Sequence, residues 1–136
     1  MRHLLLPCLG ALFLAASASA ADPVRATLTT GTTQPLVGEP WRYTITVKGR
    51  SGQPLVAKAR LQILDATGVV GCWKRSAMVR CSGARAGTWI TFKGRRAATI
   101  VWPAFPGTGR LVFRAIVVTG AQTLRLRAPV TVQPRP

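Results

Sequence analysis

A strict alternation of side-chain types between residues 41 and 48 restricts the fold of this chain more than any other feature. Apolar and aromatic side chains occupy every second position and polar ones the positions between, with Trp41, Tyr43, Ile45 and Val47 set against Arg42, Thr44, Thr46 and Lys48. Successive side chains of a β-strand point to opposite faces, so this pattern predicts a strand with one buried face. Since no segment after residue 20 has a sustained helical period, we expect an all-β fold.

Shorter alternating segments fill most of the remaining chain, separated by clusters of Gly and Pro that are typical of turns. The predicted strands are residues 24–30, 41–48, 58–63, 88–92, 97–102, 111–118 and 123–132, and residues 71–86 are predicted to be irregular. Pro129 indicates an edge strand or a bulge, because proline cannot donate a hydrogen bond to a neighbouring strand. About seven strands at this spacing favour an immunoglobulin-like β-sandwich, with a small closed β-barrel as the alternative.

The first 20 residues have the features of a secretion signal peptide. A short basic start precedes an apolar stretch over residues 4–16, and Ala18 and Ala20 form the A-x-A pattern of a cleavage site. The apolar stretch is too short for a stable membrane span, although an uncleaved N-terminal anchor is the alternative. We therefore expect a single domain, residues 21–136, that is secreted or held in the cell envelope and has no membrane span after cleavage. Periplasm and extracellular medium both stay open.

Two cysteines, Cys72 and Cys81, remain once the predicted signal with its Cys8 is removed. Disulfides persist outside the cytoplasm, and two cysteines allow one pairing. We expect a structural Cys72–Cys81 bridge, because a redox pair would favour C-x-x-C spacing.

The residue types needed for catalysis or metal binding are scarce. Residues 21–136 contain no histidine, and their three acids, Asp22, Glu39 and Asp65, are scattered. Residues 21–136 therefore provide no histidine base and no Ser-His-Asp arrangement, and a four-ligand metal site is hard to assemble from them. We expect no enzyme activity, no catalytic residue, no metal and no cofactor.

Two short motifs resemble those of exported bacterial immunoglobulin-like domains. Val37-Gly38-Glu39-Pro40-Trp41 leads into the alternating strand, and Gly52-Gln53-Pro54-Leu55 forms the following turn. This layout is similar to that of the YtkA-like and invasin/intimin-type groups, where a VGxP motif precedes the second strand. The resemblance implies a sandwich fold in an envelope or extracellular setting, and it implies no particular ligand.

The basic excess of the chain, 19 Lys and Arg against three acids, suggests an anionic partner. If the apolar positions point inward, the outward residues of three predicted strands are Lys58, Arg60, Arg110, Arg114, Arg125 and Arg127. In an immunoglobulin-like sandwich these strands would be C, F and G of one sheet, so the six residues would form one cationic face. Acidic wall polymer, phospholipid headgroups and exported nucleic acid are candidate ligands, with nucleic acid disfavoured outside the cytoplasm. The alternative is a solvated face that reflects an arginine-rich composition.

Aromatic residues near loops suggest a second candidate surface. Trp73 with Lys74 and Arg75, and Trp102 beside Pro103, could stack on sugar rings or peptide prolines. Alternatively, both indoles pack under the loops as core. A third hypothesis is a structural domain whose edge strand pairs with another envelope protein. The sequence does not predict the oligomeric state.

Overall fold

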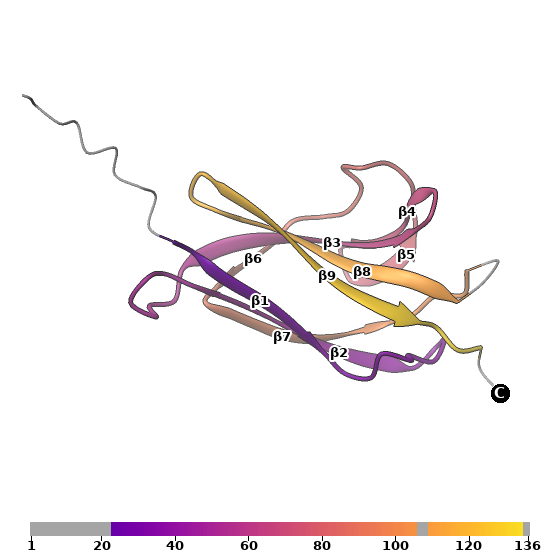
Figure 1. Cartoon of the computed structure of the whole chain (residues 1–136). Coiled ribbons are helices and arrows are strands. Elements are labelled where there is room, and N and C mark those ends of the chain that lie inside the picture. Colours follow the sequence, from indigo (N-terminus) through magenta and orange to yellow (C-terminus); the bar gives the residue numbers. More distant parts are fainter. Residues whose placement is uncertain (1–22, 106–108, 135–136) are drawn as a thin grey trace, which may run out of the picture.

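Two stacked β-sheets make up the described part of the chain, which comprises residues 23–105 and 109–134 of the computed structural model (Figure 1). Every regular element there is a strand: β1 (Arg25–Thr30), β2 (Pro40–Lys48), β3 (Val56–Asp65), β4 (Gly68–Lys74), β5 (Ala77–Arg80), β6 (Ile90–Lys93), β7 (Arg95–Val101), β8 (Arg110–Thr119) and β9 (Gln122–Thr131). The predicted signal peptide, residues 1–20, lies outside the described residues. Within them, no helix is long and apolar enough to cross a membrane.

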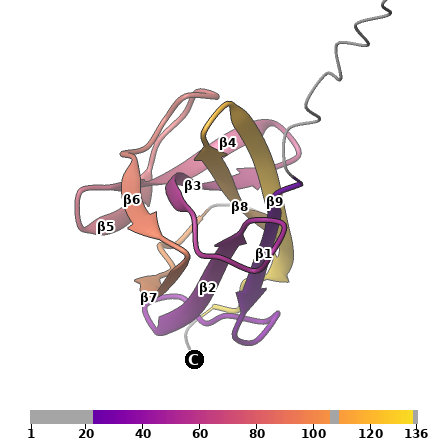
Figure 2. The same cartoon turned by 90° about the vertical axis from the view of Figure 1, so that its left-hand side faces the viewer.

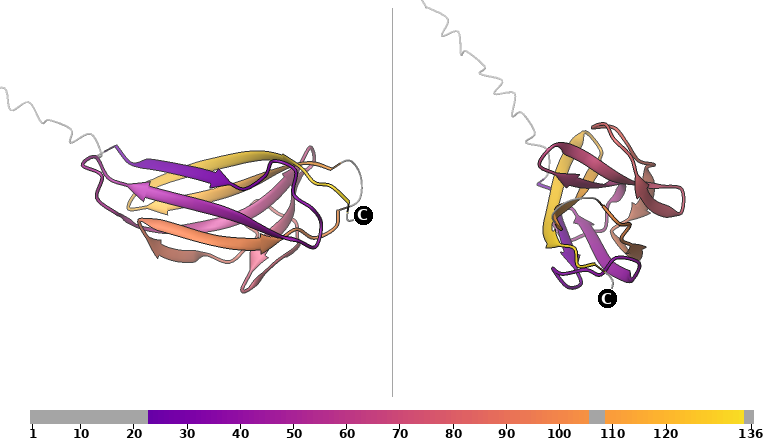
Figure 3. Two further views of the ribbon diagram at one scale, coloured as in Figure 1. Left: turned by 90° about the horizontal axis from the view of Figure 1, so that it is seen from below. Right: turned by 90° about the vertical axis from the view of Figure 1, so that its right-hand side faces the viewer.

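The strands pair into a three-stranded sheet, β1-β2-β7, and a larger sheet in the order β5-β4-β3-β8-β9, in which β6 also pairs with β3. Viewed from below, the smaller sheet lies over the larger one (Figure 3). Neither sheet closes on itself. The fold is therefore a β-sandwich, as predicted, and the alternative of a closed barrel is wrong. Nine strands are described where the sequence predicted about seven.

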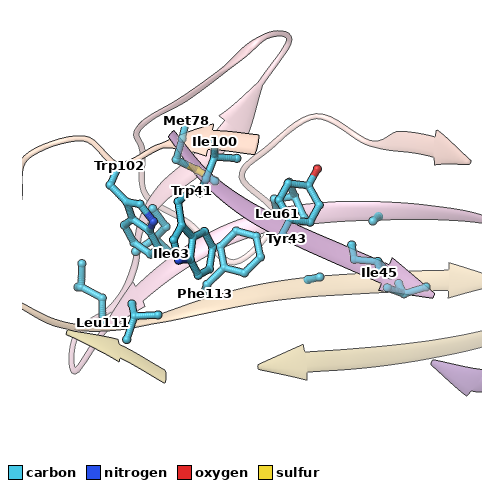
Figure 4. Packing of buried hydrophobic residues seen from close by; sticks show 14 of the residues in the cluster. Trp41, Tyr43, Ile45, Leu61, Ile63, Met78, Ile100, Trp102, Leu111 and Phe113 are labelled. Carbon is cyan, nitrogen blue, oxygen red and sulfur yellow. The ribbon is translucent and has the colours of Figure 1, made fainter. Parts of the chain in front are cut away.

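The core fills the space between the sheets with the inward side chains of β2, β3 and β8 (Figure 4). The predicted inward face of residues 41–48 is confirmed, since Trp41 is only 3% exposed and Ile45 is fully buried. Trp41 meets Trp102 and Phe113 edge to face, with ring centroids 5.2 and 5.1 Å away. Such aromatic pairs add about 0.5–1.5 kcal/mol each to the effect of burial, so this cluster fixes how the two sheets pack.

The prediction of an irregular segment over residues 71–86 is wrong in its first half, where β4 and β5 form a hairpin. The sequence of this hairpin does not alternate between apolar and polar residues, because residues on each of its two faces contact other parts of the protein. Met78 packs into the core, while Cys72 on the opposite face is fully buried and lies close to Gly87 of the loop that follows β5. The predicted bridge between Cys72 and Cys81 is present, with Cα atoms 5.9 Å apart. It ties β4 to the start of this loop, residues 81–89.

Strands β6 and β7 are a nearly continuous extended run that passes from one sheet to the other (Figure 2). The change occurs at Gly94, whose φ of 72° lies in the left-handed region. Its N–H donates to the carbonyl of Leu55 and its own carbonyl accepts from the N–H of Val47, so it contacts both sheets. A glycine is required here because other residues are strained at this φ. The run β6–β7 thereby holds the two sheets together at one side.

The opposite side of the larger sheet ends at β9, the edge strand on which Pro129 lies. The expectation that Pro129 marks an edge strand is therefore confirmed. Strand β1, the edge of the smaller sheet, lies beside β9 (Figures 1 and 2).

Candidate anion-binding face

The strands that carry the six predicted basic residues are neighbours in the larger sheet, in the order β3-β8-β9. Their outward residues form two rows across the sheet. In one row, Arg60, Ile116 and Arg125 are neighbours on β3, β8 and β9. In the next row, Gln62, Arg114 and Arg127 are neighbours on the same three strands. Because paired residues on one face have Cβ atoms about 4.5–5.5 Å apart, the arginines of the two rows are close neighbours. We call Arg60, Arg114, Arg125 and Arg127, together with Lys58 beside them on β3, the basic face.

Arg110, the sixth predicted residue, is exposed at the start of β8 and is separated from Arg114 by one outward residue, Val112. At about 3.4 Å per residue, the two positions lie roughly 14 Å apart along the strand. Arg110 instead lines an open cavity of about 880 Å³ at the end of the sandwich, together with Arg80 and the apolar residues Val70 and Leu111. The structure thus places Arg110 at the margin of the basic face.

Gln62 fixes the position of Arg114. Although polar, Gln62 is fully buried under the loop of residues 81–89. Its Nε2 donates to the carbonyls of Ala84 and Ala86 at 3.0 and 2.9 Å. Its Oε1 accepts from Nε and Nη2 of Arg114 at 3.2 and 2.5 Å. A buried amide with both ends bonded is typical of a well-ordered network, and this one holds the loop and a guanidinium against the sheet.

The charges of the basic face repel one another. Burial of Arg114, and then the nearby charges of Arg127 and Arg125, lower the pKa of its guanidinium. Arg127 is directly opposite Arg114 across the β8–β9 ladder, the arrangement in which like charges destabilise a sheet. Only two carboxylates, Glu39 and Asp65, belong to the described residues. Asp65 is occupied by Thr67, whose hydroxyl and backbone N–H both donate to it and lower its pKa.

Trp89 is a further member of the site that the sequence reasoning did not include. The Nζ atom of Lys58 and the guanidinium carbon of Arg60 lie 4.6 and 4.2 Å from the centroid of its ring. Both distances are within the range of a cation–π interaction. The indole stays half-exposed. Since Ile90 and Phe92 pack toward the core, the alternation of this strand could have placed Trp89 on the outer face.

The second candidate surface, the loop aromatics, was predicted to include Trp102, which is buried in the structure. Trp102 has no exposed area and lies in the aromatic core, where its ring contacts those of Trp41 and Phe113. Trp73 lies on β4 and is half-buried against the core, while Lys74 and Arg75 are exposed at the β4–β5 turn. The structure therefore brings no exposed pair of indoles together there, in line with the alternative that these residues pack as core.

Metal-binding clusters are not found in the described ranges. No group of three or more His, Cys, Asp or Glu residues lies close enough within residues 23–105 and 109–134 to hold a metal ion.

Comparison with known proteins finds solved structures of low identity only. No family model and no curated protein matches the chain. The CARDB domain of the Pyrococcus furiosus PF1109 protein, solved in complex with di-metal ions, is 13% identical over 82% of this chain and 93% of that one, with a TM-score of 0.46. The Pseudomonas fluorescens alkylpurine DNA glycosylase AlkC, bound to DNA containing an abasic site analogue, is 16% identical over 82% of this chain and 31% of its own, with a TM-score of 0.43. At these values neither match assigns a function.

Proposed function

We propose that this protein is a non-catalytic binding module that uses its basic face to hold an anionic partner of the cell envelope or the extracellular space. The observation that carries the proposal is the direct pairing of Arg114 with Arg127 across β8 and β9, next to Arg125. Within the described residues, neither Arg125 nor Arg127 has a side-chain hydrogen bond or a carboxylate partner. Such uncompensated charge is destabilising, and a bound anion would offset it.

The rigidity of the face supports the same function. Its four arginines come from the central, paired strands β3 and β8 and from the edge strand β9, and Gln62 further orients Arg114. Cations fixed on a sheet lose less conformational freedom on binding than cations on loops, so more of the interaction energy appears as affinity. The disulfide is compatible with a location outside the cytoplasm.

The test is binding to soluble anionic polymers at low and high salt. The probes are heparin, inorganic polyphosphate and vesicles that contain phosphatidylglycerol. We expect binding that weakens steeply as salt rises, because the polymer releases condensed counterions. The double variant Arg114→Gln/Arg127→Gln should reduce the slope of log affinity against log salt concentration by about two, because two cations are lost.

A matched control removes the same charge elsewhere. The control variant Arg42→Gln/Arg95→Gln changes two exposed residues on the outer face of the three-stranded sheet. It lowers the net charge by the same amount as the variant of the basic face. It should leave the affinity nearly unchanged. The proposal is wrong if no probe binds, if binding is insensitive to salt, or if the control variant weakens binding as much as the face variant.

A further inference from the structure

Trp89 extends the basic face into a mixed aromatic and cationic surface. It lies one residue before Ile90, which pairs with Ala59 of β3, and so it flanks Arg60 on the outer side of the sheet. Lys58 and Arg60 both approach its ring within 4.6 Å. The indole, at the end of the loop of residues 81–89, therefore lies beside the cations of β3.

The surface is elongated. Across the sheet, the row that begins at Trp89 continues through Arg60, Ile116 and Arg125 on successive strands. With strands about 4.8 Å apart, its ends are roughly 14 Å from each other. One end offers an aromatic ring, and the other offers the guanidinium groups of Arg125 and Arg127. This layout suits an extended ligand in which rings and anionic groups alternate.

A lipid surface fits this layout poorly. Proteins that bind membranes through an apolar element insert it below the headgroups. On this face Ile116 and Leu64 are each only 9% exposed, and the strongly exposed Val56 at the start of β3 has a side chain too short to reach below the headgroups. Trp89 lies against Lys58 and Arg60 and is only partly exposed.

A nucleic acid also fits poorly. Single-stranded nucleic acid is bound by several aromatic side chains on which successive bases stack. Among the described aromatic residues the others are buried in the core or packed against it, namely Trp41, Tyr43, Trp73, Phe92, Trp102, Phe105 and Phe113. Trp89 is therefore the single aromatic platform in the described part of the chain. A broad sheet face, moreover, cannot enter the major groove of a duplex, which admits a helix or a two-stranded ribbon.

We infer that the ligand of the basic face is an acidic glycan, with Trp89 packing against the C–H face of a sugar ring and Arg114, Arg125 and Arg127 binding its carboxylate or sulfate groups. This inference rests on the proposed function of the same face. The partly exposed indole provides a flat apolar surface for the ring. Guanidinium groups pair with carboxylates and sulfates by parallel hydrogen bonds. Polyphosphate carries negative charge but has no sugar rings, so it would bind the arginines without packing against Trp89.

The experiment compares ligands of similar charge that differ in having rings. Oligogalacturonate, heparin oligosaccharide, polyphosphate, phosphatidylglycerol vesicles and oligothymidylate are titrated into the full protein and its variants. Trp89→Leu should weaken both glycans about tenfold, by analogy with the loss of one stacking platform. Polyphosphate affinity should change by less than about twofold, since the arginines remain. Thr91→Ala, one outward position further along β6, is the matched control and should change neither.

A second measurement needs no variant. Bound oligogalacturonate should protect part of the tryptophan fluorescence from quenching by acrylamide, whereas polyphosphate should not. This separates a binding role of Trp89 from a loss of folding in the Trp89→Leu protein.

The outcomes distinguish this inference from the proposed function. If Trp89→Leu weakens polyphosphate and glycans equally, Trp89 only orders its neighbouring cations, and the glycan inference is wrong while the anion-binding face stands. If vesicles or oligothymidylate bind more tightly than both glycans, the ligand class is wrong and the face again stands. If none of the five ligands binds, both proposals are overturned.

Discussion

Gly94 lies between β6, which pairs in the larger sheet, and β7, which pairs in the smaller one. Its replacement by alanine tests whether this crossing from sheet to sheet stabilises the sandwich. Gly94 has a φ of 72°, and its two backbone hydrogen bonds, to Leu55 and Val47, are each 2.8 Å long. A Cβ atom added to it would lie 2.4 Å from Cβ of Pro54 and 3.2 Å from its Cα. Atoms of a proline ring cannot rotate away, so the backbone of Gly94 or of Pro54 must move.

The expected loss of stability has two parts. Holding a residue other than glycine in the left-handed region costs about 1–2 kcal/mol. Overpacking of a close contact typically costs about 1–3 kcal/mol more. The Gly94→Ala variant should therefore lose about 2–5 kcal/mol of unfolding free energy, a large part of the roughly 5–15 kcal/mol available to a domain.

The assay is urea unfolding followed by far-UV circular dichroism, with Gly52→Ala as the matched control. Gly52 has a similar φ of 81°, but a Cβ atom there meets nothing within 4 Å. The control should lose only the conformational part, about 1–2 kcal/mol. If Gly94→Ala destabilises the protein no more than Gly52→Ala, the close approach of Pro54 at the crossing does not contribute, and our account of the crossing is refuted.

Three further changes test other parts of the structure. Gln62→Leu should destabilise the protein by about 2–4 kcal/mol in urea unfolding, because it leaves two loop carbonyls and a guanidinium without their buried partner; a loss below 1 kcal/mol would contradict this. The double variant Cys72→Ala/Cys81→Ala should lose about 2–3 kcal/mol through the larger entropy of the unfolded chain, and a protein equally stable with and without a reducing agent would count against it. Thr67→Ala should raise the pKa of Asp65 toward its ordinary value, as measured by NMR titration, because a hydroxyl donor to the carboxylate is lost. Since the native structure lowers this pKa, the stability advantage of the unchanged protein should be present at neutral pH and should disappear as the pH falls through the folded-state pKa.

The basic face shows how far sequence reasoning reaches toward a site. Alternation correctly placed Arg114, Arg125 and Arg127 outward, because the period of two is a local property of every strand. It could not show that Arg114 is held by Gln62, which looks like any outward polar residue in sequence and is buried only because the loop of residues 81–89 folds over it. Nor did it separate Arg110 from the cluster.

The sequence by itself determined the class of fold and its inner face, since β-strands bury alternate side chains wherever they pack, and residues 41–48 do so in the way their pattern requires. With Cys8 assigned to the predicted signal peptide, it also predicted the pairing of Cys72 with Cys81. Tertiary structure decided what depends on contacts between distant segments. Residues 71–80 form a hairpin that contacts the core through Met78 and the following loop through Cys72. Trp102 packs in the core against Trp41, and Gly94 moves the chain between sheets. A local sequence pattern predicts to which face of a strand a side chain points. Which other segment covers that face depends on how the whole chain packs.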